Sequence, residues 1–210
     1  MSSDTAVVHI IDDDEAVRQS TAFLLRTANI QVQTYETAAN FLDALSQVKP
    51  GCVVTDVRMP GLSGIELLQR LRALKFSMPV IVITGHGDVP LAVEAMKAGA
   101  MDFIEKPFND EVLLGAVRTA LSVHAIDSKR QALNAAVNSR IASLSNRERE
   151  VLEGLVAGHP NKTIAYDLGI SPRTVEIYRA NLMTKMEATS LSDLVRMALV
   201  AGILDKGTKG

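Results

Sequence analysis

The sequence predicts two domains of different fold class, an α/β domain with a five-stranded parallel sheet followed by a small all-α domain. Two observations predict this division. Over residues 1–124, short runs of Val and Ile alternate with segments of helical spacing, whereas from residue 144 onward the apolar spacing is helical throughout. The first region also carries 10 Lys/Arg against 15 Asp/Glu, and residues 144–210 carry 9 against 8. We therefore expect domains at 1–124 and 144–210, joined by a helical linker at 125–143.

The predicted strands are continuous apolar runs, which is typical of strands buried on both faces of a parallel sheet. Helices are expected between them, because the intervening segments repeat apolar residues every three or four positions. Parallel strands joined this way have right-handed crossovers, and their ligands bind beyond the carboxyl ends of the strands, where the strand order reverses. The strands are expected at Val7–Ile11, Ile30–Tyr35, Val53–Thr55, Val80–Thr84 and Met101–Ile104. The helical stripes are Val17, Thr21, Leu24, Leu25 and Ala28; Ile65, Leu68 and Leu71; Ala92, Val93 and Met96; and Val112, Val117 and Leu121.

Four helices are predicted in the second region. The first ends at Gly158 and the short second one ends at Gly169. Ser171-Pro172 opens the third, because Ser is a favoured N-cap residue and Pro fits the first helical position. A fourth apolar stripe covers 191–199. Two helices joined by a turn that contains Gly match the helix-turn-helix motif.

Composition excludes several classes of protein. Hydrophobic residues make up 47% and charged residues 22% of the 210, which is globular composition. No apolar run approaches the ~20 residues of a membrane-spanning helix, and Met1–Thr5 shows no secretion signal. One cysteine, Cys52, excludes an internal disulfide and a multi-thiolate metal site, and its apolar neighbours indicate a buried side chain. We therefore expect a cytoplasmic protein with no membrane partner.

Polar side chains lie at the ends of four of the five predicted strands. Asp12 and Asp13 follow the first strand, Asp56 the third and Lys106 the fifth, while Thr84 closes the fourth. Because the carboxyl ends of parallel strands meet at one edge, these side chains are expected close together. Crowded carboxylates repel one another, and a hard cation with oxygen ligands, here Mg²⁺, relieves that repulsion. The ammonium and the hydroxyl complete a site for a phosphoryl group transferred to Asp56.

Each residue also has a plainer interpretation. Asp14 and Glu15 are expected to cap the next helix, Asp56 alone fits a turn before Pro60-Gly61, and Lys106 alone fits a solvated loop. The coincidence of four strand ends with complementary chemistry favours the site. His86, between two glycines, is interpreted as part of its flexible rim rather than as a general base.

The spacing of Asp12-Asp13, Asp56, Thr84 and Lys106-Pro107 resembles the receiver domain of bacterial two-component response regulators, over residues 5 to about 124. The resemblance implies a flavodoxin-like (CheY-like) fold and transfer of a phosphoryl group to Asp56 from the phosphohistidine of a sensor kinase. It also implies that Asp13, Asp56 and the backbone carbonyl of Arg58 hold Mg²⁺ with Asp12 behind them, and that Thr84 and Lys106 contact the phosphoryl oxygens. Phe103 matches the aromatic switch of the family, although a plain core phenylalanine is an equal interpretation. The phosphoaspartate is then a signal, so an enzyme is not expected.

The third helix of the second region, 172–186, has two distinct faces on a helical wheel. Val175, Tyr178, Leu182 and Met186 are expected to pack inward. The opposite face is suited to the major groove of DNA, with side chains that reach bases, while flanking groups and the preceding helix contact phosphates. The alternative is a four-helix core with a solvated charged face. The expected DNA contacts are Asn161, Lys162, Ser171, Arg173, Thr174, Glu176, Ile177, Arg179, Ala180 and Lys185.

A second resemblance covers residues 144 to about 203. Leu144–Leu152, Asn161–Ala165 and Ile170–Glu176 closely resemble the LuxR-type helix-turn-helix, and Tyr178 departs from the histidine common there. A receiver followed by this motif is the arrangement of the NarL/FixJ class of response regulators. Stretches such as Val82–Pro90 and Asp102–Phe108 are most similar to its FixJ members.

The resemblance implies a transcription activator that binds promoter DNA as a homodimer once phosphorylated and acts on RNA polymerase. Val93, Met96 and Met101 are expected to support the dimer. A FixL-like sensor histidine kinase and nitrogen-fixation genes under low oxygen are implied by the FixJ resemblance alone. The alternatives are another two-component pathway and an aspartyl-nucleophile phosphatase. Asp12-x-Asp14 fits the start of the phosphatase motif, but Ala16 departs from it.

Overall fold

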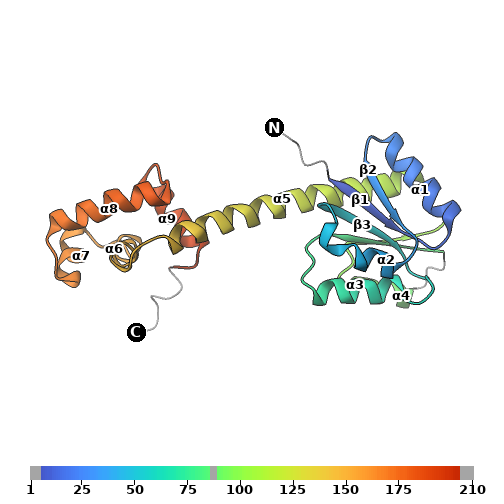
Figure 1. Cartoon of the computed structure of the whole chain (residues 1–210), viewed down its shortest axis with the longest axis horizontal. Helices are drawn as coiled ribbons and strands as arrows, with labels where there is room; N and C mark the ends of the chain where they lie inside the picture. The colour runs from blue at the N-terminus through green and yellow to red at the C-terminus, as the bar shows by residue number, and fades with distance from the viewer. Residues whose placement is uncertain (1–5, 86–88, 204–210) are drawn as a thin grey trace. The chain divides into compact units, whose positions relative to one another are not determined.

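The computed structural model describes residues 6–85 and 89–203, which form two compact units that divide between Asp127 and Ser128 (Figure 1). That division lies inside the predicted linker, whose limits at 125–143 stay a prediction. The first unit contains β1 (Val7–Ile11), α1 (Glu15–Thr27), β2 (Gln31–Tyr35), α2 (Ala38–Asp43), the 3-10 turn η1 (Leu45–Gln47), β3 (Gly51–Asp56), α3 (Gly64–Ala73), β4 (Val80–Thr84), α4 (Val89–Ala98), β5 (Asp102–Glu105) and the start of α5 (Asp110–Ala142).

The sheet has the strand order β2-β1-β3-β4-β5, and every pair of neighbours is parallel. Helices cover both faces, as Figure 1 shows. The helices α2, α3 and α4 pack on one face through residues such as Phe41, Leu68 and Ala95. The helices α1 and α5 pack on the other face through residues such as Leu25 and Leu113. The predicted five-stranded parallel α/β fold is confirmed.

Two elements of this unit differ from the sequence expectations. In α5, Val112 was predicted on the same stripe as Val117 but is 51% exposed, whereas Val117 is buried. The short helix α2 was not expected, and it buries Phe41 between Tyr35 and Phe76, with ring centroids 5.0 and 6.1 Å away.

In α4, Val93 and Met96, which the sequence analysis places on an apolar stripe and also among the candidate dimer residues, are 45% and 50% exposed. Ala95 is the fully buried residue of this helix, and Leu91 and Ala98 pack beside it, partly buried against the same core.

The second unit is all-helical, as predicted. The last turns of α5 contribute Val137 and Ile141 to its core, together with α6 (Asn146–Val156), α7 (Asn161–Leu168), α8 (Pro172–Met186) and α9 (Leu191–Val200). Gly169 ends α7 in the left-handed conformation at φ 65°. The Ser171 hydroxyl accepts the N–H of Thr174 and Pro172 occupies the first turn, so α8 begins where the sequence predicts. Among residues 6–85 and 89–203, no helix combines the length and apolar character that crossing a bilayer requires.

Candidate functional site

The strand order brings the predicted acidic residues together. β1 lies between β2 and β3, so the order reverses at β1 and β3, the place where sheets of this topology bind ligands. Asp12 directly follows β1, and Asp56 is the last residue of β3. Both side chains are largely buried, with 8% and 11% of their surface exposed. Two carboxylates are thereby held at the carboxyl edge of the sheet.

Lys106 lies between these two carboxylates. Its ammonium donates to Asp56 Oδ1 at 2.8 Å and to Asp12 Oδ2 at 3.0 Å. The backbone N–H of Lys106 donates to the Thr84 carbonyl at 2.7 Å, which fixes the segment after β5 against the end of β4. One cation therefore bridges residues that lie 94 and 50 positions away in the sequence.

Burial and charge act in opposite directions on these groups. Burial raises the pKa of Asp12, while the hydrogen bond and the charge of Lys106 partly oppose that rise. Burial also acts to lower the pKa of Lys106, but the bonds with Asp56 and Asp12 outweigh it, so the Lys106 pKa is raised. The ammonium is thus a permanent positive charge at neutral pH, placed where an added negative group would meet it.

Backbone groups orient the two acids. Asp56 Oδ2 accepts the N–H of Arg58 at 2.6 Å, and Asp12 Oδ1 accepts the N–H of Asp14 at 3.0 Å. α3 starts in close contact with the Asp56 backbone, since a Cβ atom built on Gly64 lies 2.1 Å from the Asp56 carbonyl oxygen. Only glycine allows that approach. The position of Asp56 is therefore set by its own main chain and by the start of α3.

Asp13, in contrast to Asp12, points outward. It is exposed and lines an open cleft of about 680 Å³ together with Arg58, Met59 and Glu66. Within the described ranges, no group of three or more His, Cys, Asp and Glu side chains forms a complete metal-binding cluster. The four predicted metal ligands therefore lie in two places. Asp12 and Asp56 are hydrogen-bonded to Lys106, whereas Asp13 and Arg58 line the adjoining cleft.

Thr84 and Phe103 lie on the two strands next to this edge. Thr84 is the last residue of β4, is buried and pairs in register with Glu105. Phe103 of β5 is partly buried against the core that α4 covers. His86 lies outside the described residues.

Asp14 caps α1, because its carboxylate accepts the N–H groups of Ala16 and Val17 at 2.8 and 3.2 Å.

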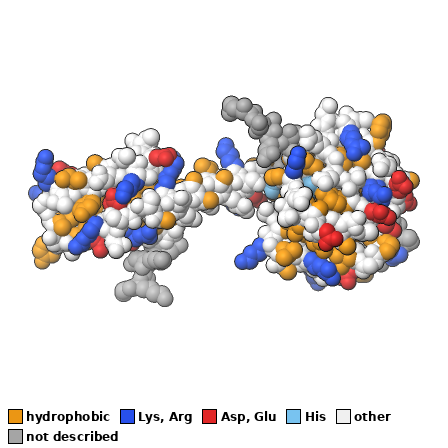
Figure 2. Space-filling view, viewed as in Figure 1, with side chains coloured by type: hydrophobic (Ala, Val, Ile, Leu, Met, Phe, Trp, Pro, Cys, Tyr) orange, Lys and Arg blue, Asp and Glu red, His pale blue; other side chains and the backbone are white. Residues whose placement is uncertain are grey.

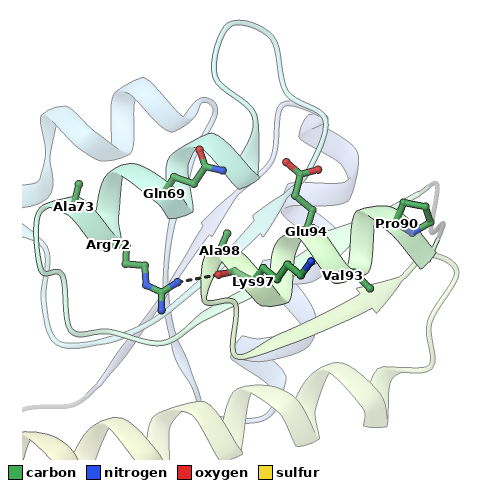
Figure 3. A pocket seen from close by; sticks show the side chains of 8 residues that line it. All are labelled: Gln69, Arg72, Ala73, Pro90, Val93, Glu94, Lys97 and Ala98. Carbon is green, nitrogen blue, oxygen red and sulfur yellow. Dashed lines mark hydrogen bonds between the residues drawn. The ribbon is translucent and has the colours of Figure 1, made fainter.

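α4 is connected to α3 beside this site (Figure 3). The Arg72 guanidinium donates to the Lys97 carbonyl at 2.9 Å, and it also contacts the position of Gly99, just after α4 ends. Pro90 and Val93 of α4 are among the residues that line an open groove of about 800 Å³ between the two helices. The helix that carries the exposed Val93 and Met96 is thus held at its C-terminal end by a side chain of α3.

In the second unit, the two faces that the helical wheel predicts for α8 differ in burial. Val175, Leu182 and Met186 are buried, and Tyr178 packs partly against them. On the outer face Ile177 is 56% exposed, and the side chains beside it are exposed as well. The exposed members of the predicted contact set are Lys162, Ser171, Arg173, Glu176, Ile177, Ala180 and Lys185, while Asn161, Thr174 and Arg179 are half-buried.

Three of these residues make contacts within the unit. The hydroxyls of Ser171 and Thr174 lie 2.8 Å apart at the start of α8. The Lys185 ammonium donates at 2.8 Å to Glu148, whose side chain is only 5% exposed. Basic and acidic side chains are interspersed over the visible face of this unit (Figure 2). The outer face of α8 is accordingly open, whereas Lys185 has an internal partner.

Two contacts at these sites were not expected from the sequence. Arg18 of α1 donates to the Asp12 carbonyl at 2.6 Å, and no local pattern indicates that bond. Glu148 is buried and forms a capping box with Ser145 at the start of α6. The spacing Ser145-x-x-Glu148 is a sequence signal for this cap, but it does not reveal the bond with Lys185.

Comparisons with known proteins agree with this architecture. The response regulator receiver domain model matches residues 8–118, and the luxR family model of bacterial regulatory proteins matches residues 142–198. The transcriptional regulatory protein FixJ of Azorhizobium caulinodans is 61% identical over 196 residues, or 93% of each chain. Full-length FixJ from B. japonicum is 54% identical, with a TM-score of 0.59 over 94% of this chain and 98% of that one. The response regulator StyR is 39% identical, with a TM-score of 0.86 over 93% and 98%. The chain therefore belongs to the FixJ family of response regulators, transcription factors in which a receiver domain precedes a LuxR-type DNA-binding domain.

Proposed function

We propose that Asp56 accepts a phosphoryl group from a sensor histidine kinase, and that phosphorylation promotes dimerisation and promoter binding. The observation that carries this proposal is the Lys106 ammonium between Asp56 and Asp12, at the edge where the strand order reverses. A transferred phosphoryl group adds negative charge next to Asp56. Lys106 is placed to bind that charge, and the Thr84 hydroxyl is our candidate for a second contact.

The transfer exchanges one phosphorus bond for another. An Asp56 carboxylate oxygen attacks the phosphorus of a phosphohistidine, the new O–P bond forms, and the P–N bond breaks with its electron pair leaving on the kinase histidine. Asp56 Oδ2 is oriented by the Arg58 N–H, and Oδ1 by Lys106. The main chain and Lys106 thus hold the nucleophile in place, which lowers the entropic part of the barrier.

The donor set fits Mg²⁺. Carboxylates and a backbone carbonyl are hard oxygen ligands, and Mg²⁺ needs only one or two carboxylates because it retains several waters. Asp13, Asp56 and the carbonyl of Arg58 would hold the ion, with Asp12 beside them. When bound, Mg²⁺ supplies positive charge that neutralises the phosphoryl oxygens. Asp13 and Arg58 line the open cleft through which that ion would enter.

Membership of the FixJ family supports proposals about the dimer, the DNA target and the kinase partner. We propose that exposed residues of α4, Val93 and Met96, take part in a phosphorylation-dependent homodimer. Two α8 helices then bind two half-sites in promoter DNA, and the complex acts on RNA polymerase. Similarity to FixJ proteins supports a FixL-like haem kinase as the phosphodonor and nitrogen-fixation genes as targets.

The first test is incubation of the full chain with Mg²⁺ and acetyl phosphate. We expect one phosphoryl group per chain by intact mass, lost in Asp56→Asn, together with dimer formation by light scattering and tighter binding to promoter DNA. The Asp56→Asn variant keeps the shape of the site, so unchanged circular dichroism excludes unfolding. An adduct on Asp56→Asn, or equal dimer populations with and without the phosphodonor, contradicts the proposal. Steady release of phosphate over many turnovers indicates the phosphatase alternative instead.

The proposed kinase is tested separately. A phosphorylated FixL-like kinase is expected to transfer to this chain faster than an unrelated histidine kinase at equal concentration. Equal transfer rates from both kinases favour another two-component pathway while leaving Asp56 as the acceptor.

A further inference from the structure

The helical unit has a second concave surface, separate from the face proposed for DNA. We call it the α6–α7 groove: a cavity of about 410 Å³ whose walls include Glu150, Glu153 and Gly154 of α6 and Ile164, Asp167 and Leu168 of α7. This volume lies within the range of protein pockets that bind ligands or anchor side chains.

The floor of the groove is apolar because the two helices approach closely. A Cβ atom added to Gly154 lies 2.8 Å from Ile164 Cγ1, so the glycine makes room for that isoleucine. Ile164 is buried, and Leu168 beside it is half-buried. Because Ile164 fills the space beside Gly154, the apolar surface left for a partner is that of the half-buried Val156 and Leu168.

The rim of the groove is acidic. Glu153 and Asp167 are exposed on opposite walls, and Glu150 is half-buried. Arg147 neutralises part of this charge through Glu150, at 2.9 Å, and His159 lies 4.0 Å from Asp167. Glu153 and Asp167 place a negative charge on each of the two walls. Such a rim repels DNA, RNA and anionic lipid, and it attracts lysine and arginine side chains.

The groove lies apart from the face proposed for DNA. In the described part of the chain, its walls contain no residue of α8, and they share no member with the predicted DNA contacts. A unit whose α8 lies in a major groove therefore still presents the α6–α7 groove to a protein partner. The combination of an apolar floor and a charged rim is typical of anchor pockets in protein interfaces.

We propose that the α6–α7 groove is the docking site for a cationic segment of RNA polymerase, which packs one aliphatic side chain against Val156 and Leu168 and places Lys or Arg between Glu153 and Asp167. This inference rests on the proposed function only in that the chain must activate transcription from bound DNA. It assigns a separate task to each surface: α8 binds DNA and the α6–α7 groove recruits the enzyme.

The test compares DNA binding with activation. The double variant Glu153→Gln, Asp167→Asn removes the rim charge without changing side-chain size, and Glu187→Gln removes an exposed acid elsewhere in the same unit. Each full-length protein is phosphorylated with acetyl phosphate. Operator binding is then measured by anisotropy, and transcription is measured in vitro with purified RNA polymerase at saturating regulator. We expect unchanged operator affinity and a fall in transcription of about tenfold for the double variant, with both readouts unchanged for Glu187→Gln.

Two outcomes overturn the proposal. Full transcription by the double variant shows that the rim has no role in activation. Tighter operator binding by the unphosphorylated double variant shows that the groove holds the receiver of this chain instead. Loss of operator binding in the phosphorylated wild type contradicts the proposed function itself, so the two failures are distinguishable.

A direct contact is tested by photo-cross-linking. Cys52 is buried, and burial raises the pKa of its thiol to about 12, so it stays unreactive. The variant Glu153→Cys therefore offers one accessible thiol for a maleimide photo-cross-linker, and Glu187→Cys is the matched control. We expect a cross-link to purified RNA polymerase on promoter DNA from position 153 only. Equal cross-linking from both positions, or from neither, overturns the proposal.

Discussion

Each unit holds a lysine against a buried carboxylate, but the two pairs have different surroundings. Lys106 bridges Asp12 and Asp56 at the edge of a sheet, beside an open cleft that Asp13 and Arg58 line. Lys185 bonds Glu148, which already accepts the Ser145 N–H in the capping box of α6. In the first pair the cation holds two acids from different strands next to solvent. In the second it joins α8 to the start of α6. The same lysine–carboxylate pairing lies at the proposed phosphoryl site in one unit and holds two helices together in the other.

Loss of Lys106 is expected to have the largest effect on function. Lys106→Met removes the cation that faces the added phosphoryl charge, and we expect phosphorylation by acetyl phosphate to slow about 100-fold. Intact mass against time measures the rate, and thermal unfolding of the receiver checks that the fold persists. A rate within a few-fold of wild type contradicts the role proposed for this lysine.

Loss of Lys185 is expected to reduce the stability of the helical unit. Lys185→Met leaves the Glu148 carboxylate buried without its cation, which is expected to cost about 2 kcal/mol of the free energy of unfolding of this unit. Hydrogen exchange of α6 and α8 peptides measures that loss. If Lys185 is not a phosphate contact, the salt dependence of DNA binding stays the same, whereas Lys162→Met reduces its log–log slope by about one. A reduced slope in Lys185→Met restores the lysine to the DNA interface.

The smallest effect is a pH dependence. The hydrogen bond from Lys185, followed by the bond from Ser145, lowers the pKa of Glu148. A carboxyl group with a lowered folded-state pKa stabilises the fold above its unfolded pKa of about 4.3, and this stability is lost as the pH falls through the folded value. We expect Glu148→Gln to flatten the acid side of the stability curve of the helical unit, with little change in slope between pH 6 and 8. Parallel curves for the two proteins contradict this assignment.

The sequence predicted the receiver site more fully than the helical unit, and the difference is physical. In a parallel sheet, strand ends meet at one edge, so Asp12, Asp56 and Lys106 were identified from their positions after apolar runs alone. A helical wheel gives only the direction of a side chain. It placed Lys185 beside the outer face but contained no information on Glu148, 37 residues earlier, which bonds it.

The helices of the receiver show a similar limit. Periodicity identified α1 and α3, whose inner faces carry large aliphatic residues. It did not identify α2, which has six residues and too few turns to repeat a pattern. It also placed Val93 and Met96 of α4 on one apolar stripe without deciding between core and surface, because exposed apolar residues can have the same spacing as core residues. Hydrophobicity alone does not distinguish an interior from an unoccupied interface.

Gly64 has a consequence for how inactive alleles of this regulator are read. A side chain there meets the Asp56 carbonyl oxygen at 2.1 Å, so even alanine must displace the end of β3. Such an allele keeps every charged residue of the site, and a sequence comparison that inspects only those residues scores it as intact. A genetic screen for loss of signalling should recover substitutions at position 64 as well as at Asp56. The position-64 variants should lose signalling because Asp56 is displaced, although every charged side chain of the site is still present.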